Sequence, residues 1–212
     1  MSSQTILQVE NLKVNFNVTS EGDMPWTKPK KLQAVNDVSF QLNSGETLGI
    51  VGESGCGKST LARAIVKMVP THSGKVIWLG NNLLELNKSE MRHHRKQIQM
   101  IFQDPLASLD PRMNIGEIIA EPLRTHYPKT PEADVKLRVS DVMNKVGLLD
   151  NLVNRYPHEF SGGQCQRIGI ARALILKPKL IICDEPVSAL DVSIQAQVVN
   201  LLMELQEEMG LT

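Results

Sequence analysis

At residues 52–59 the chain reads Gly52-Glu53-Ser54-Gly55-Cys56-Gly57-Lys58-Ser59, which matches the pattern G-x-x-x-x-G-K-[ST]. An apolar, strand-like run precedes this stretch, and a helix-like segment over residues 58–68 follows it. Strand, glycine-rich loop and helix in this order predict a phosphate-binding loop, because glycines let backbone amides and a helix N-terminus face an anion. The predicted nucleotide contacts are Gly52, Glu53, Ser54, Gly55, Cys56, Gly57, Lys58, Ser59 and Thr60.

Lys58 and Ser59 carry the chemistry of this loop. The Lys58 ammonium would reach the β- and γ-phosphates of a nucleoside triphosphate, and the Ser59 hydroxyl would bind magnesium. The alternative is an ordinary glycine-rich turn, which does not require the Lys-Ser pair. Cys56 is either a small residue of the loop or a thiol whose alkylation a bound nucleotide would block.

Asp184 and Glu185 follow the apolar run 180–183, which we expect to be a fully buried parallel strand. The carboxyl ends of such strands are where α/β sheets bind ligands. We interpret Asp184 as a carboxylate of the magnesium shell and Glu185 as the base that orients and deprotonates an attacking water. An isolated acidic pair would instead suggest the N-cap region of a helix. Together with the phosphate loop, the pair favours a catalytic site.

The stretch Ser161-Gly162-Gly163-Gln164 opens a predicted helix over residues 162–175, with Ser161 as its N-cap. Two glycines at this position leave backbone amides exposed, so an anion is expected there. The alternative is a capped helix with no ligand.

The rest of the chain contains both strand-like and helix-like segments. Strand-like segments are expected at residues 6–18, 34–42, 47–51, 76–79 and 98–102, a helical block at 104–154, and an amphipathic helix at 192–209. Between the first two strands, residues 19–31 have the composition of an inserted loop. Strand-like and helix-like segments in this order predict an α/β protein.

Composition excludes several classes of function. The 212 residues carry 23 basic and 23 acidic side chains, so the chain has no net positive charge that would favour binding to nucleic acid. The three cysteines are far apart and have no Cys-x-x-Cys spacing, which argues against a disulfide framework or a zinc site and fits a reducing cytosol. No secretory signal is expected, and the sequence contains no apolar run of about 18 residues, the length needed to cross a membrane as a helix. If the protein acts at a membrane, we expect it to dock there.

Five elements in order resemble the motifs of ABC-type ATPases: the phosphate loop, Gln103 after a strand, Ser161–Gln164, Asp184-Glu185, and Ser188-Ala189-Leu190-Asp191. The resemblance implies an ABC-type P-loop NTPase fold, with a mixed sheet core, an antiparallel region and a helical subdomain at residues 104–166. ATP and Mg²⁺ are the implied ligands, and ATP hydrolysis is the implied activity. It also implies that Gln103 senses the γ-phosphate through magnesium and water. Contacts to the ATP of an opposite subunit would come from Ser161, Gly163 and Gln164, and Asp191 would link the two sites. Phe16 resembles the adenine-stacking aromatic but equally suits the core, and Trp26 is a weaker candidate.

Longer stretches, residues 101–112, 156–160 and 183–193, are similar to the oligopeptide and dipeptide importer subfamily of ABC ATPases. The resemblance covers nearly the whole chain. It implies an ATP-hydrolysing subunit at the cytoplasmic face of a bacterial inner membrane, bound peripherally. The implied partners are a second ABC ATPase subunit, two transmembrane permease subunits and, indirectly, an extracytoplasmic peptide-binding protein, with no nucleic acid.

The chain departs from the family at its C-terminus. The switch histidine and the strand before it should follow Thr212, so we expect residues 1–212 to be one incomplete nucleotide-binding domain that lacks its last core strands. The alternative function is therefore a truncated subunit that binds ATP and partners but hydrolyses poorly. A soluble ABC ATPase of DNA repair or translation is a further alternative, but it would carry long coiled-coil insertions or tandem cassettes.

Overall fold

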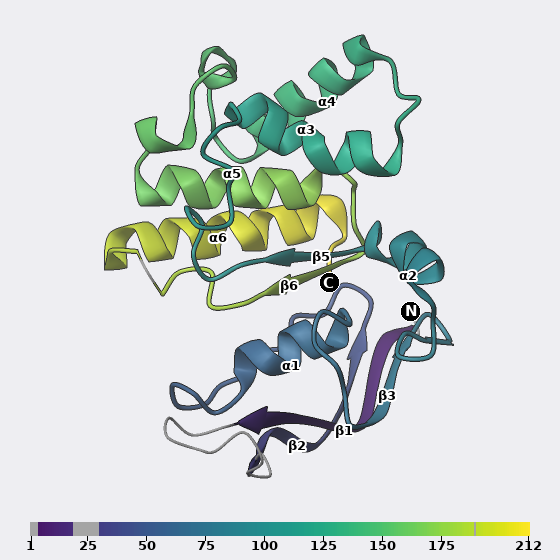
Figure 1. The fold of residues 1–212 in the computed structure, drawn as a ribbon. Helices are drawn as coiled ribbons and strands as arrows, with labels where there is room; N and C mark the ends of the chain where they lie inside the picture. The colour runs from purple at the N-terminus through teal and green to yellow at the C-terminus, as the bar shows by residue number, and fades with distance from the viewer. Residues whose placement is uncertain (1–3, 19–29, 189) are drawn as a thin grey trace, which may run out of the picture. The chain divides into compact units, whose positions relative to one another are not determined.

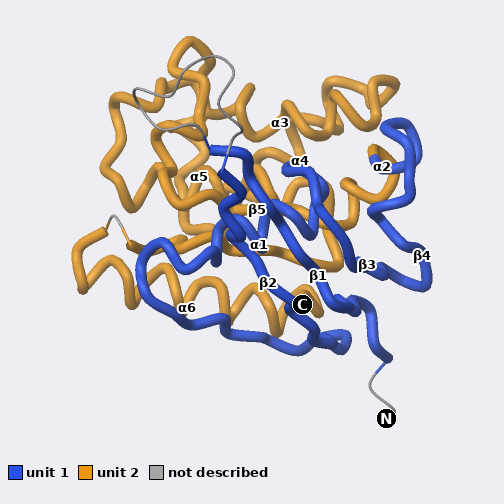
Figure 2. The backbone as a smooth tube through the Cα atoms, turned by 60° about the horizontal axis from the view of Figure 1, so that its bottom comes forward, with its two compact units in different colours: residues 1–91 blue, residues 92–212 orange. Residues whose placement is uncertain are grey.

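A computed structural model describes residues 4–18, 30–188 and 190–212. Its contacts divide the chain into two compact units, residues 1–91 and 92–212, each described here by itself (Figure 2). Of the inserted loop expected at 19–31, only Lys30 and Lys31 are described. They belong to a strand and not to a loop, because they pair with Val18 and Asn17. Trp26 lies outside the described residues.

Unit 1 is built on an antiparallel sheet, which confirms the antiparallel region expected from the sequence. Its strands run in the order β2-β1-β3-β4, with bounds β1 (Thr5–Val18), β2 (Lys30–Asn43), β3 (Ser73–Trp78) and β4 (Asn81–Asn82). Buried residues of β1 alternate in two runs, first Leu7 and Val9, then Leu12 and Val14, and the register shifts between the runs where Asn11 has a left-handed backbone (φ 45°). This period of two places one apolar face of the central strand toward the core.

Helix α1 (Lys58–Ile65) packs against β1 and β2 through Leu61, Ala64 and Ile65. The helix is shorter than the 58–68 predicted. It ends where Lys67 adopts a left-handed backbone, φ 54°, and donates its ammonium to the carbonyls of Leu84 (2.7 Å) and Leu86 (2.6 Å). Because these contacts reach a distant turn, the local helical pattern did not reveal them.

The strand predicted at residues 47–51 is absent from the described structure. The segment has no regular secondary structure, and its apolar side chains are exposed, with Val51 96% accessible. A strand exists only through hydrogen bonds to a neighbour, and none of the four strands of the unit 1 sheet pairs with this segment. The prediction was therefore wrong for this structure.

Unit 2 combines a parallel strand pair with helices (Figure 1). Its elements are β5 (Ile98–Ile101), α3 (Ile115–His126), α4 (Glu132–Lys145), the 3₁₀ turns η1 (Asp150–Leu152) and η2 (Pro157–Glu159), α5 (Gly162–Leu174), β6 (Leu180–Cys183) and α6 (Val192–Met209); α2 (Lys88–Arg95) crosses the boundary between the units. The β5–β6 pair is parallel, as predicted, but β6 is only partly buried, because Cys183 is exposed.

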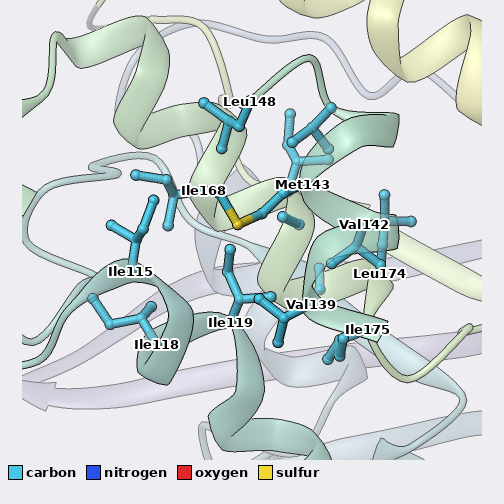
Figure 3. Close-up of a cluster of buried hydrophobic side chains, with 14 of the residues drawn as sticks. Ile115, Ile118, Ile119, Val139, Val142, Met143, Leu148, Ile168, Leu174 and Ile175 are labelled. Carbon is cyan, nitrogen blue, oxygen red and sulfur yellow. The ribbon is translucent and has the colours of Figure 1, made fainter. Parts of the chain in front are cut away.

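Helix α5 is the centre of unit 2. It contacts β5, α3, α4 and α6, and Figure 1 shows it between the strand pair and α3–α4. Eight of its thirteen residues are buried, so it is apolar on more than one face. Figure 3 shows the Met143 sulfur surrounded by Ile115, Ile119 and Ile168, side chains of α3 and α5. This shared core holds α5 against α3 and α4.

The last residue of the chain pairs with β6. The Thr212 N–H donates to the Lys179 carbonyl (3.1 Å), and the Ile181 N–H donates to the Thr212 carbonyl (2.9 Å). Two such bonds on either side of one residue are the ladder of a parallel strand. Leu211, beside it, is buried. The chain that follows α6 therefore returns to the sheet at Thr212, beside β6.

Candidate functional site

The phosphate-binding loop lies in unit 1, between β2 and α1. Gly55 and Gly57 have left-handed backbones, φ 78° and 102°. A Cβ on Gly57 would lie 2.1 Å from the Ala34 carbonyl oxygen, so only glycine fits. Gly57 is also the N-cap of α1 and supplies no side-chain cap. The first backbone amides of α1 therefore receive no side-chain cap from Gly57, as an anion site requires.

Lys58 folds back over this loop. Its ammonium donates to the carbonyls of Gly52 (2.8 Å) and Glu53 (3.0 Å). The Cys56 N–H donates to the Glu53 carbonyl at 3.3 Å, which closes the loop into a turn. Lys58 is therefore held across the mouth of the loop, on its own backbone, in the position from which it would meet a phosphate. Ser59 and Thr60 follow in the first turn of α1 and are half-buried.

Phe16 lies in β1 opposite Leu32 and is half-buried, outside the buried core of unit 1. The sequence left two interpretations open, a core side chain or an adenine-stacking one. A half-buried ring keeps one part accessible, which is what stacking on a base needs. The stacking role stays a prediction.

Asp184 and Glu185 leave the carboxyl end of β6, where the sequence placed them. Asp184 is 3% exposed, and its N–H donates to the Ile101 carbonyl (2.9 Å), so the end of β6 is tied to the end of β5. Glu185 has a left-handed backbone, φ 47°. For a side chain with a Cβ this conformation costs about 1–2 kcal/mol, and such strain collects at functional sites.

Gln103, Glu185 and Ser188 form one hydrogen-bonded group. The Gln103 Nε2 donates to Glu185 Oε2 (3.0 Å) and lies 3.5 Å from Ser188 Oγ, while Ser188 Oγ donates to the Glu185 carbonyl (3.1 Å). Gln103 is 82 residues from Glu185 in the chain. The structure thus brings together three residues that the sequence assigned to separate motifs.

Ser161 is the N-cap of α5, as predicted, and the structure adds a reciprocal bond from Gln164. Ser161 Oγ accepts from the Gln164 N–H (3.3 Å), and Gln164 Oε1 accepts from the Ser161 N–H (3.0 Å). The two polar side chains therefore serve the helix itself in this structure. Amides of Gly162 and Gly163 remain the groups suited to an anion.

The two glycines of this stretch have a second function that the sequence did not reveal. A Cβ on Gly163 would lie 2.6 Å from Ile194 Cγ2, and one on Gly162 would lie 3.3 Å from Leu190 Cδ2. Asp191, the N-cap of α6, lies between these two contacts in the chain. The start of α5 and the start of α6 are thus packed closely because glycine permits it.

Sequence reasoning also missed Arg172, near the end of α5. Its guanidinium donates to the carbonyl (2.6 Å) and the hydroxyl (3.4 Å) of Ser108, a few residues after Gln103. The available signal was a lone arginine inside the apolar run Ile170–Leu174, because a buried cation needs a defined partner.

The residues assigned to magnesium divide between the units: Ser59 in unit 1, and Gln103 and Asp184 in unit 2. A hydroxyl, a carboxamide oxygen and a carboxylate are the hard oxygen donors that Mg²⁺ prefers. The bond from Gln103 to Glu185 uses the carboxamide nitrogen and not its oxygen. Among the described residues no cluster of three or more His, Cys, Asp or Glu side chains could hold a metal ion.

Comparison with known proteins identifies the family. The model of the ABC transporter family matches residues 35–188, most of the chain. The chain belongs to the ABC transporter family. Nothing in the described residues is long and apolar enough to serve as a membrane-spanning helix.

Curated relatives place this ABC cassette near one subfamily. It is 66% identical to the oligopeptide transport ATP-binding protein OppF of Salmonella typhimurium over 209 residues, 99% of this chain and 63% of that protein. It is 65% identical to OppF of Escherichia coli and 63% identical to OppF of Haemophilus influenzae. The sequence resemblance extended to the F-type ATP-binding subunit of the oligopeptide permease, and these relatives confirm it. The cassette spans less than two thirds of their length.

Solved structures agree on the fold. The ATP-binding cassette MJ0796, solved as a dimer in a post-hydrolysis state bound to ADP and Pi, matches with a TM-score of 0.83 at 28% identity, over 97% of this chain and 84% of that one. The cassette cbiO1 of Clostridium perfringens matches with a TM-score of 0.80 at 27% identity, over 99% and 76%. The predicted ABC ATPase fold is confirmed.

Proposed function

We propose that this chain is the ATP-binding and ATP-hydrolysing part of a subunit of a bacterial peptide importer. The observation that supports hydrolysis best is the group formed by Gln103, Glu185 and Ser188 beside the buried Asp184. The hydrogen bond from the Gln103 amide orients the Glu185 carboxylate, as a base for water must be oriented. Identity of 63–66% to OppF proteins supports the peptide class.

Each residue would have a distinct task. The Gly52–Ser59 loop and the amides of α1 would hold the phosphates, with Lys58 leaving its two carbonyl partners to meet the γ-phosphate. Ser59, Gln103 and Asp184 would hold Mg²⁺, which neutralises the charge that develops on the phosphates. Glu185 would take the proton of the attacking water. The water oxygen would bond to the γ-phosphorus as the bond from that phosphorus to the β-phosphate oxygen breaks, and ADP would leave. Glu185 would then pass its proton to the released phosphate and return to its bond with Gln103.

The same proposal assigns the second half of the site to a partner cassette. The amides of Gly162 and Gly163, with Ser161 and Gln164, would contact the γ-phosphate of ATP bound to a second ABC subunit, and Asp191 would connect the two sites. A dimeric cassette among the similar structures supports such an arrangement. Two permease subunits, a peptide-binding protein outside the membrane, and a peripheral position at the cytoplasmic face complete the proposal.

The domain boundaries belong to the proposal as well. We assign residues 1–212 to one nucleotide-binding domain, with 104–166 as its helical subdomain. The described helices α3 and α4 and both 3₁₀ turns fall within 104–166, which supports that boundary.

The substitution Glu185→Gln tests the hydrolytic part. It keeps the size of the side chain and removes the base, so we expect phosphate release to fall by about 10²- to 10⁴-fold while ATP binding is retained. Glu207→Gln, an exposed position on α6, is the matched control and should hydrolyse normally. Equal phosphate release from the wild type and Glu185→Gln would overturn the assignment.

Peptide transport needs a separate test. The chain should co-purify with the membrane subunits of a peptide permease, and peptides delivered by the binding protein should raise its ATP hydrolysis in vesicles. Stimulation by another solute, such as a sugar, with none by peptides would reject the peptide class while leaving the ATPase proposal intact.

A further inference from the structure

Arg172 connects helix α5 to the segment that follows Gln103. Its Nη1 donates to the Ser108 carbonyl at 2.6 Å, and its Nη2 lies 3.4 Å from Ser108 Oγ. The residue is half-buried and lies between the buried Ala171 and Ala173. Burial lowers the pKa of the guanidinium, and the charge of Glu121 opposes this shift. A cation in such surroundings is held by specific partners and not by solvent.

Ser108 closes a compact turn that begins directly after Gln103. The Ser108 N–H donates to the Asp104 carbonyl (3.2 Å), the Ala107 N–H donates to Asp104 Oδ1 (2.9 Å), and Ser108 Oγ donates to the Pro105 carbonyl (2.8 Å). Arg172 binds the far end of this turn, whereas Gln103 is attached to its near end. The turn therefore links α5 to Gln103 through Ser108 and Asp104.

We propose that Arg172 is a positioning residue, which anchors the 104–108 turn to α5 and thereby holds the Gln103 carboxamide against Glu185. Its role in hydrolysis rests on the proposed function. The anchoring itself does not, because it is a statement about the turn. Since α5 begins with the Ser161–Gln164 stretch, the same helix carries the predicted partner-ATP contact at one end and this anchor near the other.

The chemistry of the contact calls for arginine. One planar guanidinium reaches two acceptors of the same residue, the carbonyl and the hydroxyl of Ser108. A lysine ammonium is a compact point donor, so it would keep the charge but lose the planar fork that places one nitrogen on each acceptor. Methionine would keep the apolar stem and neither bond. These two substitutions separate the hydrogen bonds of Arg172 from its bulk.

Arg167 offers a matched control on the same helix. Its Nη1 donates to the Val146 carbonyl, also at 2.6 Å, at the end of α4. Arg167→Met therefore removes an equally short arginine–carbonyl bond from α5 at a place far in sequence from the 104–108 turn. Any effect common to both variants reports the loss of packing and stability. An effect found only for Arg172→Met reports the anchor.

Hydrogen exchange on the 212-residue chain without nucleotide is the decisive measurement. In Arg172→Met, the amides of Ala107 and Ser108 should exchange roughly tenfold faster or more, because a bond to a charged donor no longer closes the turn. Arg172→Lys should fall between the wild type and Arg172→Met. In Arg167→Met these amides should be unchanged. Unchanged exchange in Arg172→Met, or an equal increase in Arg167→Met, would overturn the proposal.

Hydrolysis gives a second, independent readout. With Gln103 displaced, Arg172→Met should need several-fold more Mg²⁺ for half-maximal phosphate release per folded molecule, while its ATP affinity stays close to that of the wild type. A wild-type chain that releases no phosphate would count against the proposed function and leave the exchange result valid. A normal Mg²⁺ dependence in Arg172→Met with accelerated exchange would overturn the link from the turn to Gln103.

Discussion

Gly163 and Ile194 are packed so closely that a Cβ on the glycine would lie 2.6 Å from Ile194 Cγ2. The contact joins the first turn of α5 to the first turn of α6. Because Ile194 is branched at Cβ, its Cγ2 cannot move away without a change of rotamer. The pair therefore couples the Ser161–Gln164 stretch to the segment around Asp191.

The substitution Gly163→Ala should destabilise the chain by about 1–3 kcal/mol, the usual cost of overpacking. Most of that cost should disappear in an Ile194→Ala background, where the clashing methyl is gone. Chemical denaturation of the wild type, both single variants and the double variant measures the coupling. Strict additivity of the two changes would mean that the contact does not limit this position.

Two glycines of the phosphate loop allow a second matched comparison. Gly55 and Gly57 both have positive φ, but only Gly57 is crowded, by the Ala34 carbonyl at 2.1 Å from its virtual Cβ. Gly55→Ala should cost about 1–2 kcal/mol for the backbone conformation alone. Gly57→Ala adds a clash with backbone, so it should lower the melting temperature further and abolish binding of a fluorescent ATP analogue. Similar losses in the two variants would contradict this reasoning.

Asp110 provides a prediction on pH. A hydrogen bond from the Arg112 side chain, followed by one from its backbone N–H, lowers the pKa of Asp110 from 3.8 to about 2. A depressed carboxyl pKa contributes stability above the unfolded pKa and loses it as pH falls through the folded one. The contribution is therefore present above about pH 4 and is lost between about pH 4 and 2.

Carbon NMR of the Asp110 carboxyl measures this titration directly. In Arg112→Met the pKa should return toward 3.8, while the neutral-pH melting temperature should barely change, because exposed ion pairs are screened by water. A titration near 4 in the wild type would show that the pair is not formed in solution.

Elements with a clear local pattern could be predicted from the sequence. The helix over 192–209 was predicted with its observed bounds, because apolar residues recur at helical spacing from Ile194 onward and Gly210 ends the helix with a left-handed backbone. Ser161 was predicted as an N-cap from residue type alone, and the structure shows the cap. Asp184 and Glu185 were placed at the end of a strand in the same way, because the apolar run 180–183 marks that strand.

What the sequence could not reveal depends on neighbours distant in the chain. Residues 47–51 have strand composition, but pairing requires a partner that composition does not name. The bond between Gln103 and Glu185, the anchor of Arg172 on Ser108, and the contact of Gly163 with Ile194 each join two segments through one or two atoms. Hydrophobic periodicity reports which face is buried, not which side chain meets which.

Helices α5 and α3 have the same kind of N-terminal cap. Comparing them separates the ATP contact proposed for the Ser161–Gln164 stretch from its contribution to stability. Asn114 caps α3 in the same reciprocal way, with Asn114 Oδ1 accepting from the Glu117 N–H at 2.9 Å and Glu117 Oε2 accepting from the Asn114 N–H at 3.2 Å. Ser161→Ala and Asn114→Ala should each cost about 1 kcal/mol of stability, because each removes one helix cap.

Only Ser161→Ala should weaken the ATP-dependent association of two cassettes. Its hydroxyl belongs to the stretch proposed to contact a partner's ATP, whereas Asn114 belongs to a helix with no assigned ligand. Sedimentation of each variant in a Glu185→Gln background, with and without ATP, measures the association while hydrolysis is blocked. If both variants lose association equally, helix stability and not ATP contact explains the effect. If neither does, Ser161 serves α5 alone and the amides of Gly162 and Gly163 must carry the contact.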